Sequence, residues 1–120
     1  MLSLSQIHKE IHGIFAEAKP FEGEVVQNGV FINFESVSFE STMVGNYNFR
    51  LLVAGNTLDK NSKGVLPKCD ELIRTAEKNH ANCIDGALGS QLNIAQIQRV
   101  NVREGLFCYE IALNLRVRFA

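Results

Sequence analysis

Two histidines near the start of the chain have the spacing that comes closest to metal chemistry. His8 and His12 lie four positions apart, so on a helix they share one face. Their context is His-Lys-Glu-Ile-His, which misplaces the glutamate of the His-Glu-x-x-His zinc motif. No third ligand is apparent nearby in the sequence. We therefore expect solvated or boundary histidines and no metal site.

The three cysteines form no recognisable redox or nucleophile pattern. Cys69, Cys83 and Cys108 are odd in number and widely spaced, without a Cys-x-x-Cys pair, which is typical of reduced thiols. The glycines form neither a phosphate-binding loop nor a Gly-x-Ser-x-Gly elbow. The sequence thus predicts no catalytic residue and no cofactor. The rival interpretation is an enzyme whose residues converge from separate elements, around His12 or His80.

Basic side chains on the expected strands and in one loop are the candidates for contact with another protein. Arg116 and Arg118 alternate with apolar residues near the end of the chain, so they share one polar strand face. A guanidinium pairs with a carboxylate through two parallel hydrogen bonds, which suits a subunit contact. The candidate assembly interface consists of Arg50, Lys60, Lys63, Arg116 and Arg118. The alternative is a sheet face and a loop that meet only water.

An amphipathic helix is predicted near the start of the chain. Apolar residues recur at helical spacing from Ile7 to Ala18, and Ser3 with Gln6 has the spacing of a capping box. We expect Pro20 to close this helix, because the residue before a proline is disfavoured in the α region.

Three strands are expected next. Asn28-Gly29 between apolar residues predicts a type I′ turn, and hence a hairpin over residues 24–32. The apolar pattern then changes phase, which indicates a bulge near Glu35-Ser36. Gly45-Asn46 is expected to break the chain before a third strand that alternates over residues 47–53.

A second helix and a long hairpin are predicted in the rest of the chain. An exposed polar loop over residues 55–64 leads into an amphipathic helix over about residues 65–80. The hairpin has arms at about residues 92–103 and 107–119, and the second arm has seven apolar residues at period two. The fold class is therefore α+β, a single domain over residues 1–120 with the order α-β-β-β-α-β-β. Both helices are expected to pack on one face of an antiparallel sheet, and the other face to meet water or another chain.

The bulk composition excludes several classes of partner. The 120 residues suit one domain, 46% of them are hydrophobic, and the net charge is −1 with both signs spread along the chain. Without a basic footprint we expect no nucleic-acid sequence recognition. No apolar run approaches the roughly 20 residues of a membrane helix, and the pattern of a signal peptide is missing. We expect no membrane partner and a cytoplasmic location.

Two stretches of the chain resemble the Mu-like phage tail protein family. The first is Phe49-Arg50-Leu51-Leu52-Val53-Ala54-Gly55-Asn56, which precedes a polar loop and an amphipathic helix. The second is Gly105-Leu106-Phe107-Cys108-Tyr109-Glu110-Ile111-Ala112-Leu113. The element order from Ser3 to Phe119 is also similar to that of tail terminator, or tail completion, proteins. The resemblance covers nearly the whole chain in element order, but only these two stretches in residues.

The resemblance implies a structural protein that needs no catalytic residues. Such a protein forms a ring, expected to be a hexamer, on the head-proximal end of a tail tube. It stops tube growth and joins the tube to the head, so its partners are itself, the tail tube and head–tail connector proteins. Its location is then the virion tail, and the host cytoplasm during assembly. The alternative is a non-enzymatic small-ligand or regulatory binding module, which predicts a closed apolar cavity.

Overall fold

The computed structural model describes residues 2–25, 27–61 and 63–119, which form two helices and a five-stranded sheet. The elements are α1 (Leu4–Ile14), β1 (Lys19–Pro20), β2 (Gly29–Ser41), β3 (Val44–Gly55), α2 (Val65–Lys78), β4 (Gly89–Arg99) and β5 (Phe107–Arg118). The strands lie in the order β1-β2-β3-β5-β4, and every neighbouring pair except β1 and β2 is antiparallel. The predicted α+β class and element order are confirmed.

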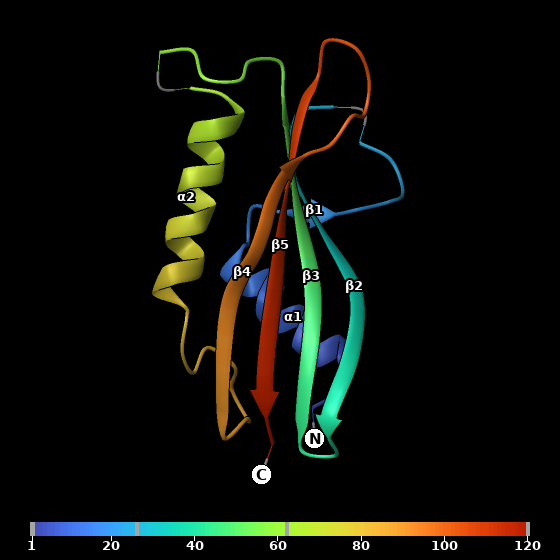
Figure 1. Ribbon diagram of the computed structural model, residues 1–120, viewed down its shortest axis with the longest axis vertical. Coiled ribbons are helices and arrows are strands. Elements are labelled where there is room, and N and C mark those ends of the chain that lie inside the picture. Colours follow the sequence, from blue (N-terminus) through green and yellow to red (C-terminus); the bar gives the residue numbers. More distant parts are fainter. Residues whose placement is uncertain (1, 26, 62, 120) are drawn as a thin grey trace.

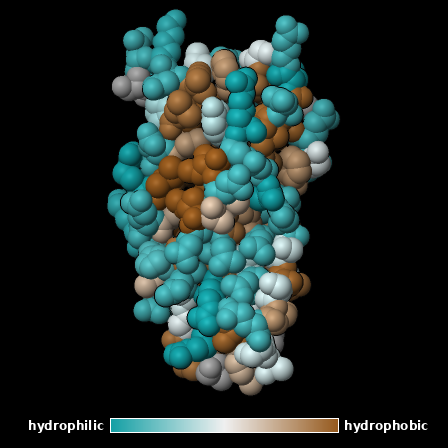
Figure 2. Space-filling model, viewed as in Figure 1, coloured by the Kyte–Doolittle hydropathy of each residue, from teal (hydrophilic) through white to brown (hydrophobic). Residues whose placement is uncertain are grey.

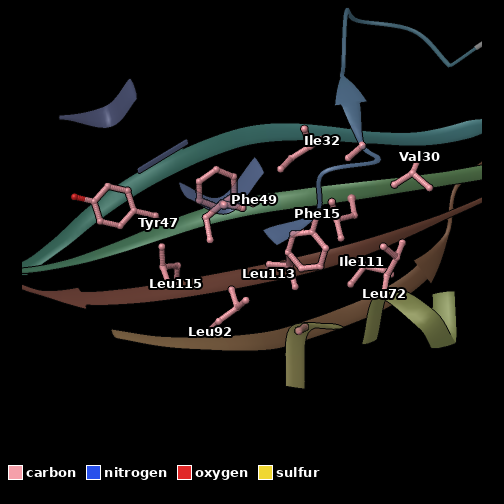
Figure 3. Packing of buried hydrophobic residues seen from close by; sticks show 14 of the residues in the cluster. Phe15, Val30, Ile32, Tyr47, Phe49, Leu72, Leu92, Ile111, Leu113 and Leu115 are labelled. Atoms are coloured by element: carbon pink, nitrogen blue, oxygen red, sulfur yellow. The ribbon is translucent and has the colours of Figure 1, made fainter. Parts of the chain in front are cut away.

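Both helices cover the same face of the sheet, as predicted. Figure 1 shows α1 behind the strands and α2 alongside them. Alternate apolar side chains of the strands meet the buried stripes of the two helices (Figure 3). The core includes Ile7, Ile11, Phe15, Val30, Ile32, Tyr47, Phe49, Leu51, Val53, Cys69, Leu72, Ala76, Ile111, Leu113, Leu115 and Val117.

The first helix begins as predicted and ends earlier than predicted. Ser3 Oγ accepts a hydrogen bond from the Gln6 amide at 3.2 Å, and Gln6 Oε1 accepts one from the Ser3 amide at 2.8 Å. The helix ends at Ile14, not at Pro20. Lys19 and Pro20 instead form β1, a short edge strand parallel to β2. An edge position tolerates proline because it requires one hydrogen bond fewer.

The hairpin predicted over residues 24–32 is wrong. β2 begins only at the glycine of the Asn-Gly pair, and the described residues between β1 and β2 belong to no strand; Val26 lies outside the described residues. Phe21 and Val25 pack near Phe31 on the sheet face away from the helices. Burial of these apolar side chains outweighs the local preference of Asn-Gly for a tight turn.

The bulge predicted near Glu35-Ser36 is confirmed, whereas the break predicted at Gly45-Asn46 is wrong. The register of β2 against β3 shifts between Phe34 and Ser36. β3 already begins one residue before the glycine, which therefore lies inside the strand. A Cβ there would stand 2.9 Å from the ring of Tyr47 and 3.2 Å from that of Phe39. Gly45 thus leaves space for the rings of Tyr47 and Phe39 and does not turn the chain.

The second helix and the final hairpin agree with the prediction to within a few residues. α2 ends at Lys78, and β4 ends at Arg99, before the predicted end of its arm. Gly105, with φ of +79°, lies in the connection that precedes β5. The 12 residues of β5 extend roughly 40 Å at ~3.3 Å per residue, in a molecule 47 Å long.

Replacing Leu113 with alanine is expected to lower the free energy of unfolding by about 2–5 kcal/mol. The side chain is 1% exposed on β5, which lies between β3 and β4, so its loss leaves a cavity in the core. Urea denaturation of both proteins measures the difference. A loss below ~0.5 kcal/mol would contradict this placement of the core.

Replacing Tyr47 with phenylalanine is expected to raise the free energy of unfolding by about 1 kcal/mol. The side chain is fully buried, and its hydroxyl has no hydrogen-bond partner among the described residues. Burial also raises the pKa of this phenol. The change removes an unpaired polar atom and keeps the ring in the core. A loss of stability of similar size, in the same denaturation experiment, would mean that the hydroxyl has a partner.

Candidate functional site

The sheet face away from the helices carries a ladder of polar side chains. Asn114 Nδ2 donates to Asn48 Oδ1 at 3.1 Å, and Asn48 Nδ2 donates to Ser36 Oγ at 3.1 Å. These residues are register partners on β5, β3 and β2. We call this surface, together with Arg50 and Arg116 on the same strands, the polar face.

Arg50 lies at the centre of the polar face and is held by two carboxylates. Its guanidinium forms ion pairs with Glu35 and Glu110, and Nη2 lies 3.2 Å from Glu35 Oε1. Gln98 Nε2 donates to Glu110 Oε1 at 3.1 Å. The Glu110 side chain is only 11% exposed, so Arg50 and Gln98 supply the partners that a largely buried carboxylate needs. Arg50 of β3 therefore links β2 and β5 through its two ion pairs.

The two arginines of β5 have different surroundings. Arg116 Nε donates to Glu40 Oε2 at 2.7 Å, and Asn46 Nδ2 donates to the same oxygen at 2.8 Å. Arg118 forms no ion pair with any residue that the structure describes. Both guanidinium-bearing side chains line a hollow of about 290 Å³ beside the start of β4. Arg118 is thus available to a carboxylate of another protein, whereas Arg116 already has one.

Exposed apolar side chains gather at the end of the molecule where Arg118 lies. Phe39, Met43 and Leu88 are 50%, 48% and 63% exposed. Backbone hydrogen bonds join the segments of Met43, Leu88 and Arg118, from the Leu88 amide to the Arg118 carbonyl at 2.9 Å and from the Phe119 amide to the Met43 carbonyl at 2.8 Å. Phe39 pairs with Gly45 nearby, and its ring lies beside that of Tyr47 on the helix-covered side. Figure 1 shows that both termini lie at this end, which we call the terminal end. Phe39, Met43, Leu88 and Arg118 form the end patch.

Lys60 and Lys63 lie at the opposite end, the loop end. Their loop connects β3 with α2 and projects beyond both elements (Figure 1). Backbone hydrogen bonds of 2.8 and 2.9 Å between the two lysines close its tip, whereas Ser62 lies outside the described residues. Gly64, with φ of +118°, turns the chain into α2, and a Cβ there would stand 2.5 Å from the Thr57 carbonyl oxygen. The five residues predicted as one interface therefore occupy three separate places.

A hollow that the sequence analysis missed lies on the polar-face side, toward the loop end. Segments 21–25 and 100–102 cross this face and form its walls. Arg50, Leu52 and Glu110 form part of its floor, and its volume is about 330 Å³. We call it the sheet hollow. The sequence signal for this hollow is limited to the apolar residues of the two segments, Phe21, Val25, Val100 and Val102.

The walls of the sheet hollow belong to a second apolar cluster. It contains Val25, Phe31, Leu52, Ala54, Leu106 and Cys108. In Figure 2 hydrophobic side chains gather over the half of the molecule toward the loop end, and hydrophilic ones dominate the other half. We expected the sheet face away from the helices to meet water or another chain. That expectation is wrong near Cys108, where segments 21–25 and 100–102 of the same chain cover the face.

The histidines and cysteines make structural contacts. His12 Nε2 donates to the Ala18 carbonyl at 2.7 Å, and His80 Nδ1 donates to the Leu92 carbonyl at 3.1 Å. Burial raises the pKa of Cys69 to about 11, which keeps it a neutral thiol at neutral pH. Within the part of the chain that the structure describes, no three His, Cys, Asp or Glu side chains converge as metal ligands. No helix in those same segments has the length and apolar character needed to cross a membrane.

A scan against protein-family models and a search of curated proteins found no match to the chain. The two stretches that resemble the tail protein family lie side by side in the sheet, since residues 51–55 of β3 pair with residues 107–111 of β5. Both stretches supply core positions, so their apolar pattern reflects packing. The resemblance stays a prediction, and the functional argument rests on the surfaces described above.

Arg116 is expected to keep the Glu40 carboxyl ionised below its ordinary pH range. The hydrogen bond from Arg116, supported by that from Asn46, lowers the pKa of Glu40 below 4.5. Because the folded-state pKa is lowered, the pair stabilises the fold above pH 4.5, and this contribution is lost as the pH falls through the lowered pKa. An NMR titration of the Glu40 carboxyl should give a midpoint below 4.5, and R116Q should raise it. R118Q is the matched control, and equal midpoints in all three proteins would contradict the pairing.

Proposed function

We propose that this protein is a tail terminator of a phage or prophage, a structural subunit that assembles into a hexameric ring on the tail tube. The ring stops tube growth and joins the tube to the head through connector proteins. The observation that carries the proposal is the end patch, because one end of an elongated molecule carries three apolar side chains that are about half exposed or more and a guanidinium without an ion-pair partner among the described residues. Aromatic residues, methionine and arginine are enriched in protein contacts.

The shape of the subunit supports this use of the end patch. Its principal extents are 47 × 27 × 21 Å, and the strands run along the long axis (Figure 1). Subunits that stand parallel to the axis of a ring contact one another along their sides and present an end to the structure above or below. A patch at one end then serves the tail tube or the connector, and the sides serve the neighbouring copies. The protein acts in the virion tail and assembles in the host cytoplasm.

One observation bears on the rival function, a non-enzymatic small-ligand or regulatory binding module. The sheet hollow has room for a small molecule. Its rim contains Gly23, Glu24 and Asn101, all of them exposed, so the hollow is open to solvent. The rival predicts a closed apolar cavity, and for this reason we favour the assembly function.

The test replaces the end patch without disturbing the core. A variant with Met43→Ser, Leu88→Ser and Arg118→Glu should fold normally, because all three side chains are exposed. We expect cells that carry this variant in the parent genome to release tails of uncontrolled length or tails without heads. Electron microscopy of the particles gives the result, and thermal unfolding of the purified variant checks the fold.

Ile97→Ser is the matched control for the loss of exposed apolar surface. Ile97 is 40% exposed on β4, outside the end patch, and its replacement should leave tails and heads normal. Normal tails from the end-patch variant would contradict the role of the patch. If the parent genome with the unchanged gene yields no tail particles, the proposed function itself is wrong.

A further inference from the structure

The sheet hollow combines apolar walls with an excess of negative charge. Glu24 lies on its exposed rim, and Glu110, with Arg50, belongs to its floor. The lining thus has two carboxylates against one guanidinium, and Glu35, which lies outside the lining, pairs with the same guanidinium. The walls come from segments 21–25 and 100–102, whose apolar residues are Phe21, Val25, Val100 and Val102. A cationic group on an aliphatic stem fits such a surface, because the stem covers the walls and the charge meets the carboxylates.

The loop at the loop end presents two groups of this kind. Lys60 and Lys63 are exposed, and Asp59 is the single acidic residue of the loop, so the loop has a net positive charge. Neither lysine forms an ion pair within the part of the chain that the structure describes. Paired backbone hydrogen bonds join the two lysines, and the Thr57 carbonyl accepts a hydrogen bond of 3.0 Å from the Val65 amide at the start of α2. A loop held in this way loses little conformational entropy when it docks.

The loop and the hollow lie at the same end of the molecule but on opposite sides of the sheet. The loop leads into α2, on the helix-covered side, whereas Arg50 and Leu52 of the hollow's floor point to the other side. A rotation about an axis along the strands turns the loop side of one copy toward the hollow side of the next. Contacts between two different surfaces close into a ring when the rotation between copies closes.

We propose that the sheet hollow of one subunit receives Lys60 and Lys63 of a neighbouring copy of this chain. The inference rests on the proposed function, since it assigns the contact between subunits of the ring. The charges of the two surfaces are complementary, and the contact leaves the end patch free at the terminal end for a different partner.

Cross-linking between isotopically distinct copies tests the contact directly. Rings are assembled on tail tubes from an equal mixture of ¹⁴N- and ¹⁵N-labelled protein and treated with a carbodiimide, which joins lysine amines to nearby carboxylates. We expect mass spectrometry to find Lys60 or Lys63 joined to Glu24, with one light and one heavy partner. Glu24 is exposed and therefore accessible to the reagent.

Charge reversal supplies a second readout. Lys60→Glu with Lys63→Glu should weaken ring assembly on tubes about tenfold, as measured by co-sedimentation. Lys9→Glu with Lys78→Glu changes the net charge equally at two other exposed sites and should have no such effect. Adding Glu24→Lys and Asn101→Lys to the loop variant should restore assembly.

The matched control for that rescue is Glu22→Lys with Asn101→Lys, because Glu22 is exposed but does not line the hollow. Rings whose mixed-isotope cross-links avoid the hollow, or a loop variant that assembles as well as its control, would overturn the inference and leave the proposed function standing. A wild-type chain that forms no ring on tail tubes would overturn both.

Discussion

The alternation of apolar and polar residues along β5 decides where every surface of this protein lies. Ile111, Leu113 and Leu115 are at most 1% exposed on the helix-covered face. The residues that alternate with them must point the other way, so Glu110, Asn114 and Arg116 lie on the polar face or beneath its cover. β3 pairs with β5 over its full length and continues both faces. A slip of one residue would exchange the faces and bury charged groups among apolar ones, so the register is strongly specified.

The features that the sequence predicted correctly depend on near neighbours in the chain. The capping box requires only Ser3 and Gln6, and the bulge follows from the change of phase between Phe34 and Val37. The features that it missed depend on contacts between distant segments. The Asn-Gly pair has the local preference of a hairpin, but Val25 gains more from packing in a cluster that also contains Leu106. No pattern within a short window contains that partner.

The same limit applies to the candidate site. The shared face of Arg116 and Arg118 follows from period two, but Glu40 lies 76 positions from Arg116 in the chain. β2 has two register shifts, the first between Phe34 and Ser36 and the second between Phe39 and Ser41, on either side of Glu40. The sequence indicated the first shift only. Because the second shift was not predicted, the pairing of Glu40 with Arg116 could not be predicted either. The sequence therefore provided no reason to distinguish Arg116 from Arg118 as a contact for another protein.

For the proposed contact at the terminal end, the pairing of Arg116 determines which interactions drive binding. A partner's carboxylate at Arg116 must displace Glu40, and the exchange of one exposed ion pair for another gains almost nothing, since such pairs contribute about 0–1 kcal/mol. Burying the exposed part of Phe39, Met43 or Leu88 gains about 1 kcal/mol for each side chain. In the proposed contact the apolar residues therefore supply most of the affinity of the end patch. Arg118, which has no competing ion pair among the described residues, would then favour a partner with a carboxylate at this end.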